Sequence, residues 1–174
     1  MHTNRLAVSF LIVSSLLLLP SVSVLAQPAP TQRAQAHTIL FICEHGSAKS
    51  VIAAAHFNRL AEEKGLPYRA VSRGVQPDEA IPEVVKSGLH ADGLDVSTWK
   101  PRQVSDDDLR GAKKVVTLAC ELPKPKAATS EKLIEWKDVP AVGDGYAAAR
   151  AAIVQQVEKL LQALGEKTPN EKKP

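Results

Sequence analysis

Cysteine is scarce in this sequence, and the two residues present do not form a metal-binding pattern. Cys43 and Cys120 are the only cysteines among 174 residues, so the fold must depend on a buried core rather than on several disulfides. The paired Cys-x-x-Cys or His-x-x-x-His ligands of metal sites are absent, which argues against a site built from Cys43, His45 and Cys120. We therefore expect no bound metal and no cofactor.

A large excess of positive charge is also absent. The formal net charge is +3 at pH 7. Part of the excess lies in the C-terminal residues Lys167, Lys172 and Lys173. No basic surface long enough for a nucleic acid is indicated, and no internal repeat is visible. We expect no nucleic-acid partner.

Charge is nearly absent from the first 26 residues, where Arg5 is the only charged side chain. An apolar run follows from Leu6 to Leu25, and small residues around Ala26 suit signal peptidase. We predict a signal peptide over residues 1–26, cut after Ala26, a periplasmic or secreted protein, and no membrane association after cleavage. An uncleaved membrane anchor is the alternative. No cysteine follows the cleavage site, which argues against lipid attachment.

Removal of this segment leaves about 150 residues, the size of one domain. Residues 27–37 are rich in Pro, Ala and Gln and are predicted to form a linker, and residues 166–174 a polar, disordered tail. The domain is predicted to span residues 38–165.

Strand-like and helix-like segments alternate along this domain. The expected strands are Thr38–Ile42, Tyr68–Ser72, Lys114–Ala119 and Lys132–Trp136, and the expected helices Ser50–Lys64, Ile81–Asp92, Asp106–Arg110 and Tyr146–Leu164. Such alternation is typical of an α/β domain with a parallel sheet covered by helices. Active sites of these sheets lie at the carboxyl ends of the strands, where Cys43 and Cys120 fall.

The first strand and the first helix are joined by a short loop that carries chemically useful groups. Its sequence is Cys43-Glu44-His45-Gly46-Ser47-Ala48-Lys49. Loop N–H groups, the helix N-terminus and Lys49 would bind an oxyanion and stabilise a thiolate at Cys43. Gly46 suits a positive φ, and the Ser50 hydroxyl is available both to cap the helix and to contact the thiolate.

The pattern of Cys43, five residues, a basic residue and Ser50 resembles the phosphate loop of low-molecular-weight protein tyrosine phosphatases and of thioredoxin-coupled arsenate reductases. Four further segments resemble family features in the same order: Val71–Val75, Gly93–Val104, Val115–Cys120 and Glu135–Ala141. The resemblance implies a four-stranded parallel sheet of order 2-1-3-4 with helices on both faces. It also implies Cys43 as nucleophile and residues Glu44 to Lys49 as the oxyanion-binding loop.

The sequence departs from the family at two catalytic positions. The loop ends in Lys49 instead of Arg, and a point charge cannot make the two parallel hydrogen bonds of a guanidinium. The family's acid is an Asp directly before Pro, but Val139 precedes Pro140 here. Asp138 is the provisional general acid, with Asp144 as the alternative.

Other residues have two interpretations each. Trp99 and Tyr146 could form a substrate rim or pack in the core. Arg73 could supply the missing guanidinium or be a solvated residue after a strand. Cys120 could be a redox partner of Cys43, because neighbouring strand ends lie about 5 Å apart.

Three functions follow. The first is a phosphatase that hydrolyses phosphate monoesters through a cysteinyl-phosphate. The second is an arsenate-reductase-like enzyme that uses Cys43, Cys120 and a thiol reductant. The third is an oxyanion-binding module without turnover. The expected partner in each case is a small oxyanion or a phosphoester.

Overall fold

The computed structural model describes residues 36–122 and 131–166, within which every expected helix and strand is present. The strands are β1 (His37–Cys43), β2 (Tyr68–Gly74), β3 (Lys114–Leu118) and β4 (Leu133–Trp136). The helices are α1 (Lys49–Glu63), α2 (Glu83–Ala91), α3 (Asp106–Gly111), the 3-10 helix η1 (Val142–Asp144) and α5 (Tyr146–Glu166). The predicted signal peptide and nearly all of the predicted linker and tail lie outside the described residues.

The strands form one parallel sheet in the order β2-β1-β3-β4, as predicted. β1 is the most buried strand, with residues Ile39 to Ile42 fully inaccessible to solvent, which explains its uninterrupted apolar sequence. β2 is an edge strand. This order brings the ends of β1 and β3, and hence Cys43 and Cys120, to one edge of the sheet.

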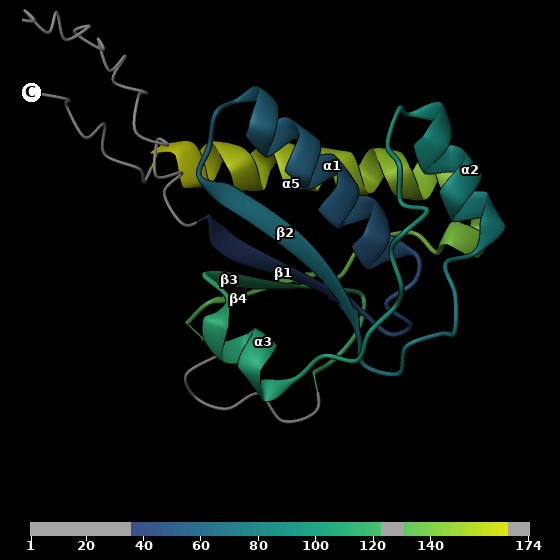
Figure 1. Cartoon of the computed structure of the whole chain (residues 1–174), viewed down its shortest axis with the longest axis horizontal. Helices are drawn as coiled ribbons and strands as arrows, with labels where there is room; N and C mark the ends of the chain where they lie inside the picture. The colour runs from purple at the N-terminus through teal and green to yellow at the C-terminus, as the bar shows by residue number, and fades with distance from the viewer. Residues whose placement is uncertain (1–35, 123–130, 167–174) are drawn as a thin grey trace, which may run out of the picture. The chain divides into compact units, whose positions relative to one another are not determined.

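Alternate residues of β1 supply two separate cores. Ile39, Phe41 and Cys43 belong to the larger core, which contains most of the buried residues of α1 and α5. Leu40 and Ile42 belong to a smaller core with the residues around α3. Helices therefore cover both faces of the sheet, and Figure 1 shows α1 and α5 on one side and α3 on the other.

The beginning of α1 differs from the prediction in one respect. We expected Ser50 to cap the helix, but the helix begins at Lys49, and its N-cap residue, Ala48, makes no side-chain capping bond. The first N–H groups of α1 therefore have no side-chain acceptor at the cap position. The hydroxyl of Ser50 contacts Cys43 instead.

A polar cluster around the buried His56 connects α1 to α5. His56 on α1 is fully buried and its Nε2 lies 3.2 Å from Oδ2 of Asp92, just after α2. Arg150 of α5 donates two hydrogen bonds to the same carboxylate, at 3.0 and 2.9 Å. Burial lowers the pKa of His56 to about 4, although the Asp92 carboxylate opposes the shift. His56 is thus held as a neutral imidazole inside the domain.

None of the helices in the described part of the chain combines the length and the hydropathy needed to cross a membrane.

Candidate active site

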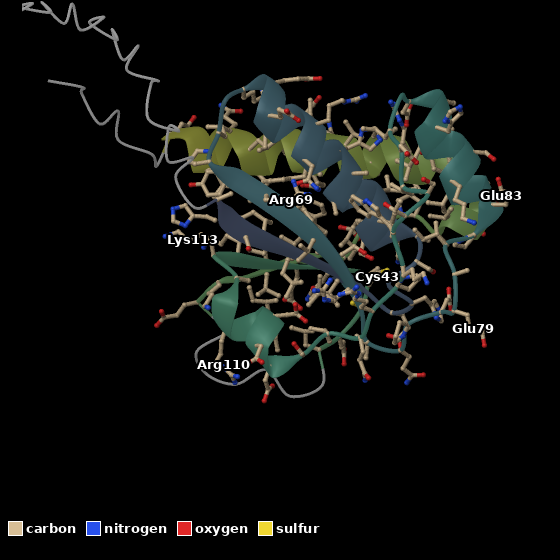
Figure 2. The ribbon with its side chains drawn as sticks, in the orientation of Figure 1. Cys43, Arg69, Glu79, Glu83, Arg110 and Lys113 are labelled. Carbon is tan, nitrogen blue, oxygen red and sulfur yellow. The ribbon has the colours of Figure 1, made fainter. Side chains whose placement is uncertain are left out.

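Cys43 is the last residue of β1 and faces the beginning of α1. Its side chain is buried, and Figure 2 labels it where the ribbon of β1 ends. The Sγ atom lies 3.2 Å from Oγ of Ser50, which is also buried. A hydroxyl that donates to sulfur stabilises the thiolate over the thiol. The predicted contact between Cys43 and Ser50 is therefore present.

The carbonyl groups of the loop are fixed by the segment that follows β2. The oxygens of Cys43, Glu44 and His45 accept hydrogen bonds from the N–H groups of Val75, Gln76 and Asp78, at 3.2, 2.8 and 3.0 Å. With the carbonyls turned to this side, the N–H groups from Glu44 to Val51 find no acceptor among residues 36–122 and 131–166. A row of free backbone donors at a helix N-terminus is the arrangement that binds oxyanions.

Gly46 makes this turn possible. Its φ is +59°, a conformation that side chains disfavour. A Cβ at Gly46 would lie 2.6 Å from the backbone N of Gly74, and a Cβ at Gly74 would lie 2.7 Å from the backbone N of Gly46. Both positions therefore require glycine, Gly46 for reasons of conformation and space and Gly74 for reasons of space.

A pocket of about 440 Å³ opens in front of the loop. Cys43, Ser47 and Lys49 line one side. Pro82 and Val84 at the start of α2, and the segment from Ala141 to Gly143, form the other walls. Val84 is 53% exposed and is the one exposed large hydrophobic side chain in the described part of the chain. The pocket thus combines a polar floor with an apolar entrance, which suits a ligand with an anionic head.

Asp78 also lines this pocket, and the sequence analysis did not single it out. One carboxylate oxygen accepts a hydrogen bond from the Ser47 hydroxyl at 2.5 Å, and the other lies 3.3 Å from Nδ1 of His45. The side chains of His45 and Asp78 are 63% and 44% exposed. A carboxylate, an imidazole and a thiol therefore share one pocket.

The two carboxylates predicted as acids lie apart from this group. Asp138 and Asp144 are both exposed, and neither lines the pocket of Cys43. Asp144 ends η1, whose preceding residues Val142 and Gly143 do line it.

The aromatic residues predicted as a rim do not line the pocket either. Trp99 lines a separate pocket at the edge of β2. The hydroxyl of Tyr146 lies 3.3 Å from Asp92, and the Tyr146 ring is so close to Gly88 that a Cβ there would lie 2.3 Å from it. Both aromatic residues pack against the core.

Arg73 does not replace the missing guanidinium of the loop. It makes two parallel hydrogen bonds with the carboxylate of Asp108, at 3.0 and 2.8 Å. Asp108 in turn completes the capping box of α3 with Ser105. Lys49 is therefore the cationic side chain that the described residues place on the pocket wall.

Cys120 does not line the pocket of Cys43 but lines a separate one. Both thiols are free, and Cys120 Sγ donates to the carbonyl oxygen of Ile42 across 3.5 Å. Burial raises the pKa of Cys120 to about 11, and the nearby charge of Cys43 acts in the same direction. The structure thus brings the two cysteines near each other but leaves Cys120 protonated at neutral pH.

Within the described ranges, no group of three His, Cys, Asp or Glu side chains is placed to hold a metal ion.

The family model for low molecular weight phosphotyrosine protein phosphatases matches residues 38–135. The chain belongs to this family. No curated protein sequence matches the chain significantly, but solved structures do. A low molecular weight protein tyrosine phosphatase from T. tengcongensis is 22% identical over 74% of this chain and 99% of its own, with a TM-score of 0.67.

Two arsenate reductases of known structure are also similar to this chain. The enzyme from Archaeoglobus fulgidus is 31% identical over 71% of this chain and 98% of its own, with a TM-score of 0.57. The thioredoxin-dependent enzyme from Corynebacterium glutamicum is 22% identical over 78% of this chain and 65% of its own, with a TM-score of 0.67. The family and fold are therefore those of phosphatase-like and arsenate-reductase-like enzymes, and the predicted resemblance is confirmed.

Proposed function

We propose that this protein hydrolyses phosphate monoesters, with Cys43 as the nucleophile. The observation that carries the proposal is the row of free N–H groups from Glu44 to Val51, which directly follows a buried thiol in contact with Ser50. Three oxygens of a phosphoryl group are suitable acceptors for such a row, and binding them places phosphorus in front of Sγ.

The proposed reaction has two steps, both at Cys43. The Cys43 thiolate attacks phosphorus, an S–P bond forms, and the P–O bond to the leaving alcohol breaks. Water then attacks the cysteinyl-phosphate, the S–P bond breaks, and inorganic phosphate leaves. The Ser50 hydroxyl, 3.2 Å from Sγ, stabilises the thiolate before the first step and as the leaving group of the second.

Lys49 supplies the positive charge of the site. Its ammonium attracts the phosphoryl oxygens but offers only a point charge, whereas a guanidinium binds two oxygens in one plane. Slow turnover is the expected consequence of this substitution.

The leaving alcohol needs a proton, and its source is part of the proposal. Asp138 and Asp144 remain predictions from the sequence. Asp78 is the stronger candidate because it lines the pocket and bridges Ser47 and His45. His45 of the loop and Asp78 line the same pocket as Cys43, so either is available to a leaving group bound there.

Arsenate reduction is the second candidate, supported by the proximity of Cys120 to β1. In that reaction Cys43 bonds to arsenic, and Cys120 then attacks the Cys43 sulfur. Two electrons pass to arsenic, arsenite leaves, and a disulfide remains for an external thiol to reduce. The high pKa of Cys120 argues against this reaction, because the thiolate is the attacking species.

An assay on an aryl phosphate and on arsenate, each with and without added thiol, tests these functions. We expect hydrolysis of the ester by the wild-type protein and by Cys120→Ser, and none by Cys43→Ser. A reductase would instead consume arsenate only with thiol, and Cys120→Ser would stop after one cycle. Phosphate binding without either reaction would indicate an oxyanion-binding module.

We also propose that the protein is exported and cut after Ala26. The support is the apolar, nearly uncharged N-terminal sequence with its small residues before Gln27. Fractionation of expressing cells and N-terminal sequencing provide the test. A mature chain outside the cytoplasm that begins at Gln27 is expected, and a cytoplasmic chain that keeps residues 1–26 would contradict it.

A further inference from the structure

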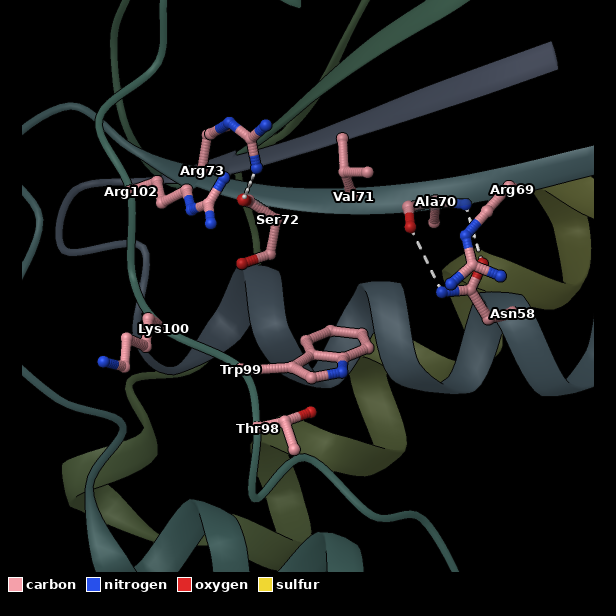
Figure 3. A pocket seen from close by; sticks show the side chains of 10 residues that line it. All are labelled: Asn58, Arg69, Ala70, Val71, Ser72, Arg73, Thr98, Trp99, Lys100 and Arg102. Carbon is pink, nitrogen blue, oxygen red and sulfur yellow. Dashed lines mark hydrogen bonds between the residues drawn. The ribbon is translucent and has the colours of Figure 1, made fainter. Parts of the chain in front are cut away.

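A second pocket lies at the free edge of β2, apart from Cys43. Its volume is about 290 Å³, and it lies between β2 and the segment from Thr98 to Arg102. Figure 3 shows Arg69 at one end, Arg102 and Lys100 at the other, and the ring of Trp99 between them. Residues 69 and 102 are far apart in the sequence, so the pocket is made by the fold.

Two arginines of this pocket, Arg69 and Arg102, differ from the others because no described carboxylate pairs with them. Four of the six arginines in the described ranges pair with an acid: Arg59, Arg73, Arg110 and Arg150. The other two are Arg69 and Arg102, for which the described residues supply no ion pair, and both line this pocket. The same holds for Lys100. Both arginines that lack an ion pair in the described ranges thus line the same pocket.

The edge of β2 is also incompletely covered there. The Asn58 side chain bonds both the N–H and the carbonyl of Ala70, at 2.7 and 3.1 Å. Gly74 bonds the backbone of Arg102 and Val104. Because backbone groups alternate along a strand, the N–H of Ser72 points to this same edge. No described group accepts a hydrogen bond from it, although the Ser72 carbonyl accepts one from Arg73.

These features define the shape and charge of a ligand. Residues 69 to 73 of a strand span about 13 Å at roughly 3.3 Å per residue, so a compact ion cannot reach both ends. An extended peptide with acidic side chains at both ends can reach Arg69 and Arg102 together. Its centre would lie over the Trp99 ring and offer an oxygen to the Ser72 N–H.

The chain's own remaining residues do not supply this ligand. Residues 1–35 and 123–130 contain no Asp or Glu, and residues 167–174 contain only Glu171. These three segments therefore do not supply the complementary charge.

We propose that this pocket binds an extended acidic segment of another protein. The proposal concerns a docking surface and does not depend on catalysis at Cys43. Binding through exposed charges weakens as salt is added, because the charges are screened.

An NMR titration of the full chain, followed through the resonances of residues 36–122 and 131–166, tests the proposal. The probe is a capped pentaglutamate peptide, and a capped pentaglutamine peptide is its neutral control. We expect pentaglutamate to shift the Ser72 amide and the Trp99 indole resonance. In the double variant Arg69→Gln, Arg102→Gln, its affinity should fall at least fivefold with unchanged thermal stability.

Two variants serve as matched controls. Arg110→Gln removes an exposed arginine that lies outside this pocket, and we expect no change in peptide affinity. Lys49→Ala should weaken phosphate binding at the loop and leave peptide affinity unchanged, which separates this proposal from the proposed function.

Four results would overturn the proposal. They are equal affinity in the double variant, equal binding of pentaglutamine, shifts confined to Glu44–Lys49, and the same shifts at Ser72 and Trp99 with inorganic phosphate at equal concentration. The last result would indicate a simple anion site.

Discussion

The backbones of Gly46 and Gly74 lie in direct contact, so closely that a Cβ on Gly46 would lie 2.6 Å from the nitrogen of Gly74. This contact joins the loop after β1 to the residue that ends β2. It lies beside the hydrogen bonds from Val75, Gln76 and Asp78 that hold the loop carbonyls. The conformation of the loop after Cys43 thus depends on a glycine 28 residues away from Gly46 in the sequence.

Gly74→Ala should separate the loop from β2 and disturb both stability and anion binding. Because backbone atoms cannot move aside as a flexible side chain can, we expect a loss on the order of 2 kcal/mol or more in the free energy of unfolding. Urea denaturation measures it. The control is Gly111→Ala, at a position with no atom within 4 Å of a new Cβ. Equal stability of the two variants would contradict the packing described for Gly74.

Lys49→Arg should raise the rate of aryl phosphate hydrolysis, and Lys49→Ala should weaken anion binding. A guanidinium stabilises the transition state through two hydrogen bonds, and a change of one main oxyanion donor alters the rate on the order of a hundredfold. Steady-state kinetics on an aryl phosphate give the comparison. The control is Lys137→Ala, since Lys137 is exposed and pairs with Glu135 outside the pocket. Equal rates for all three residues at position 49 would place Lys49 outside the reaction.

Asp78→Asn should lower kcat more than Asp138→Asn does. The amide keeps the shape of the carboxylate but cannot hold and transfer the proton, and loss of general acid catalysis costs about a hundredfold or more. A substrate whose leaving group needs no proton should reduce the difference. The reverse ranking, with Asp138→Asn the slower variant, would assign the acid to the position predicted from the sequence.

Acidification should destabilise the protein through His56. The folded pKa of about 4 lies below the value of 6.5 for an unperturbed histidine, so the unfolded chain binds the proton first as the pH falls. Stability is therefore complete above pH 6.5 and is lost as the pH falls from 6.5 to 4, by up to about 3 kcal/mol. Partial burial opposes the shift, but the Arg150 hydrogen bonds lower the pKa of Asp92. The stability that Asp92 contributes is therefore lost only at lower pH.

Urea denaturation between pH 7 and pH 4 tests this dependence. The variant His56→Gln should be less stable at pH 7, but its free energy of unfolding should depend much less on pH. His90→Gln, at an exposed position on α2, should keep the wild-type dependence. A wild-type slope that survives in His56→Gln would mean that other groups cause the acid sensitivity.

The fold and the position of the loop could be predicted from the sequence because both depend on patterns among residues that are close in the sequence. The apolar run of β1 predicts a strand, and the spacing of apolar residues in α1 predicts a helix, with a short loop between them. Gly46 indicated the positive φ that the structure contains. The parallel sheet was predicted from the alternation of strand-like and helix-like segments, and its strand order from the family resemblance.

Features that depend on contacts between distant segments could not be predicted in this way. Asp78 follows the carboxyl end of β2, which was a usable signal, but its partners Ser47 and His45 become neighbours only through folding. The expected Ser50 cap was wrong because the hydroxyl contacts Cys43 instead. Likewise, no pattern among neighbouring residues predicts the pairing of Arg73 with Asp108 or the burial of His56.

Trapping of the covalent intermediate tests the central claim most directly. The protein is mixed with an aryl phosphate, quenched in acid within the first turnover, digested and examined by mass spectrometry. Our account predicts one phosphoryl group on the peptide that contains Cys43, in the wild-type protein and in Cys120→Ser. Hydrolysis of the ester with no phosphoryl group on that peptide, or undiminished hydrolysis by Cys43→Ser, would contradict it.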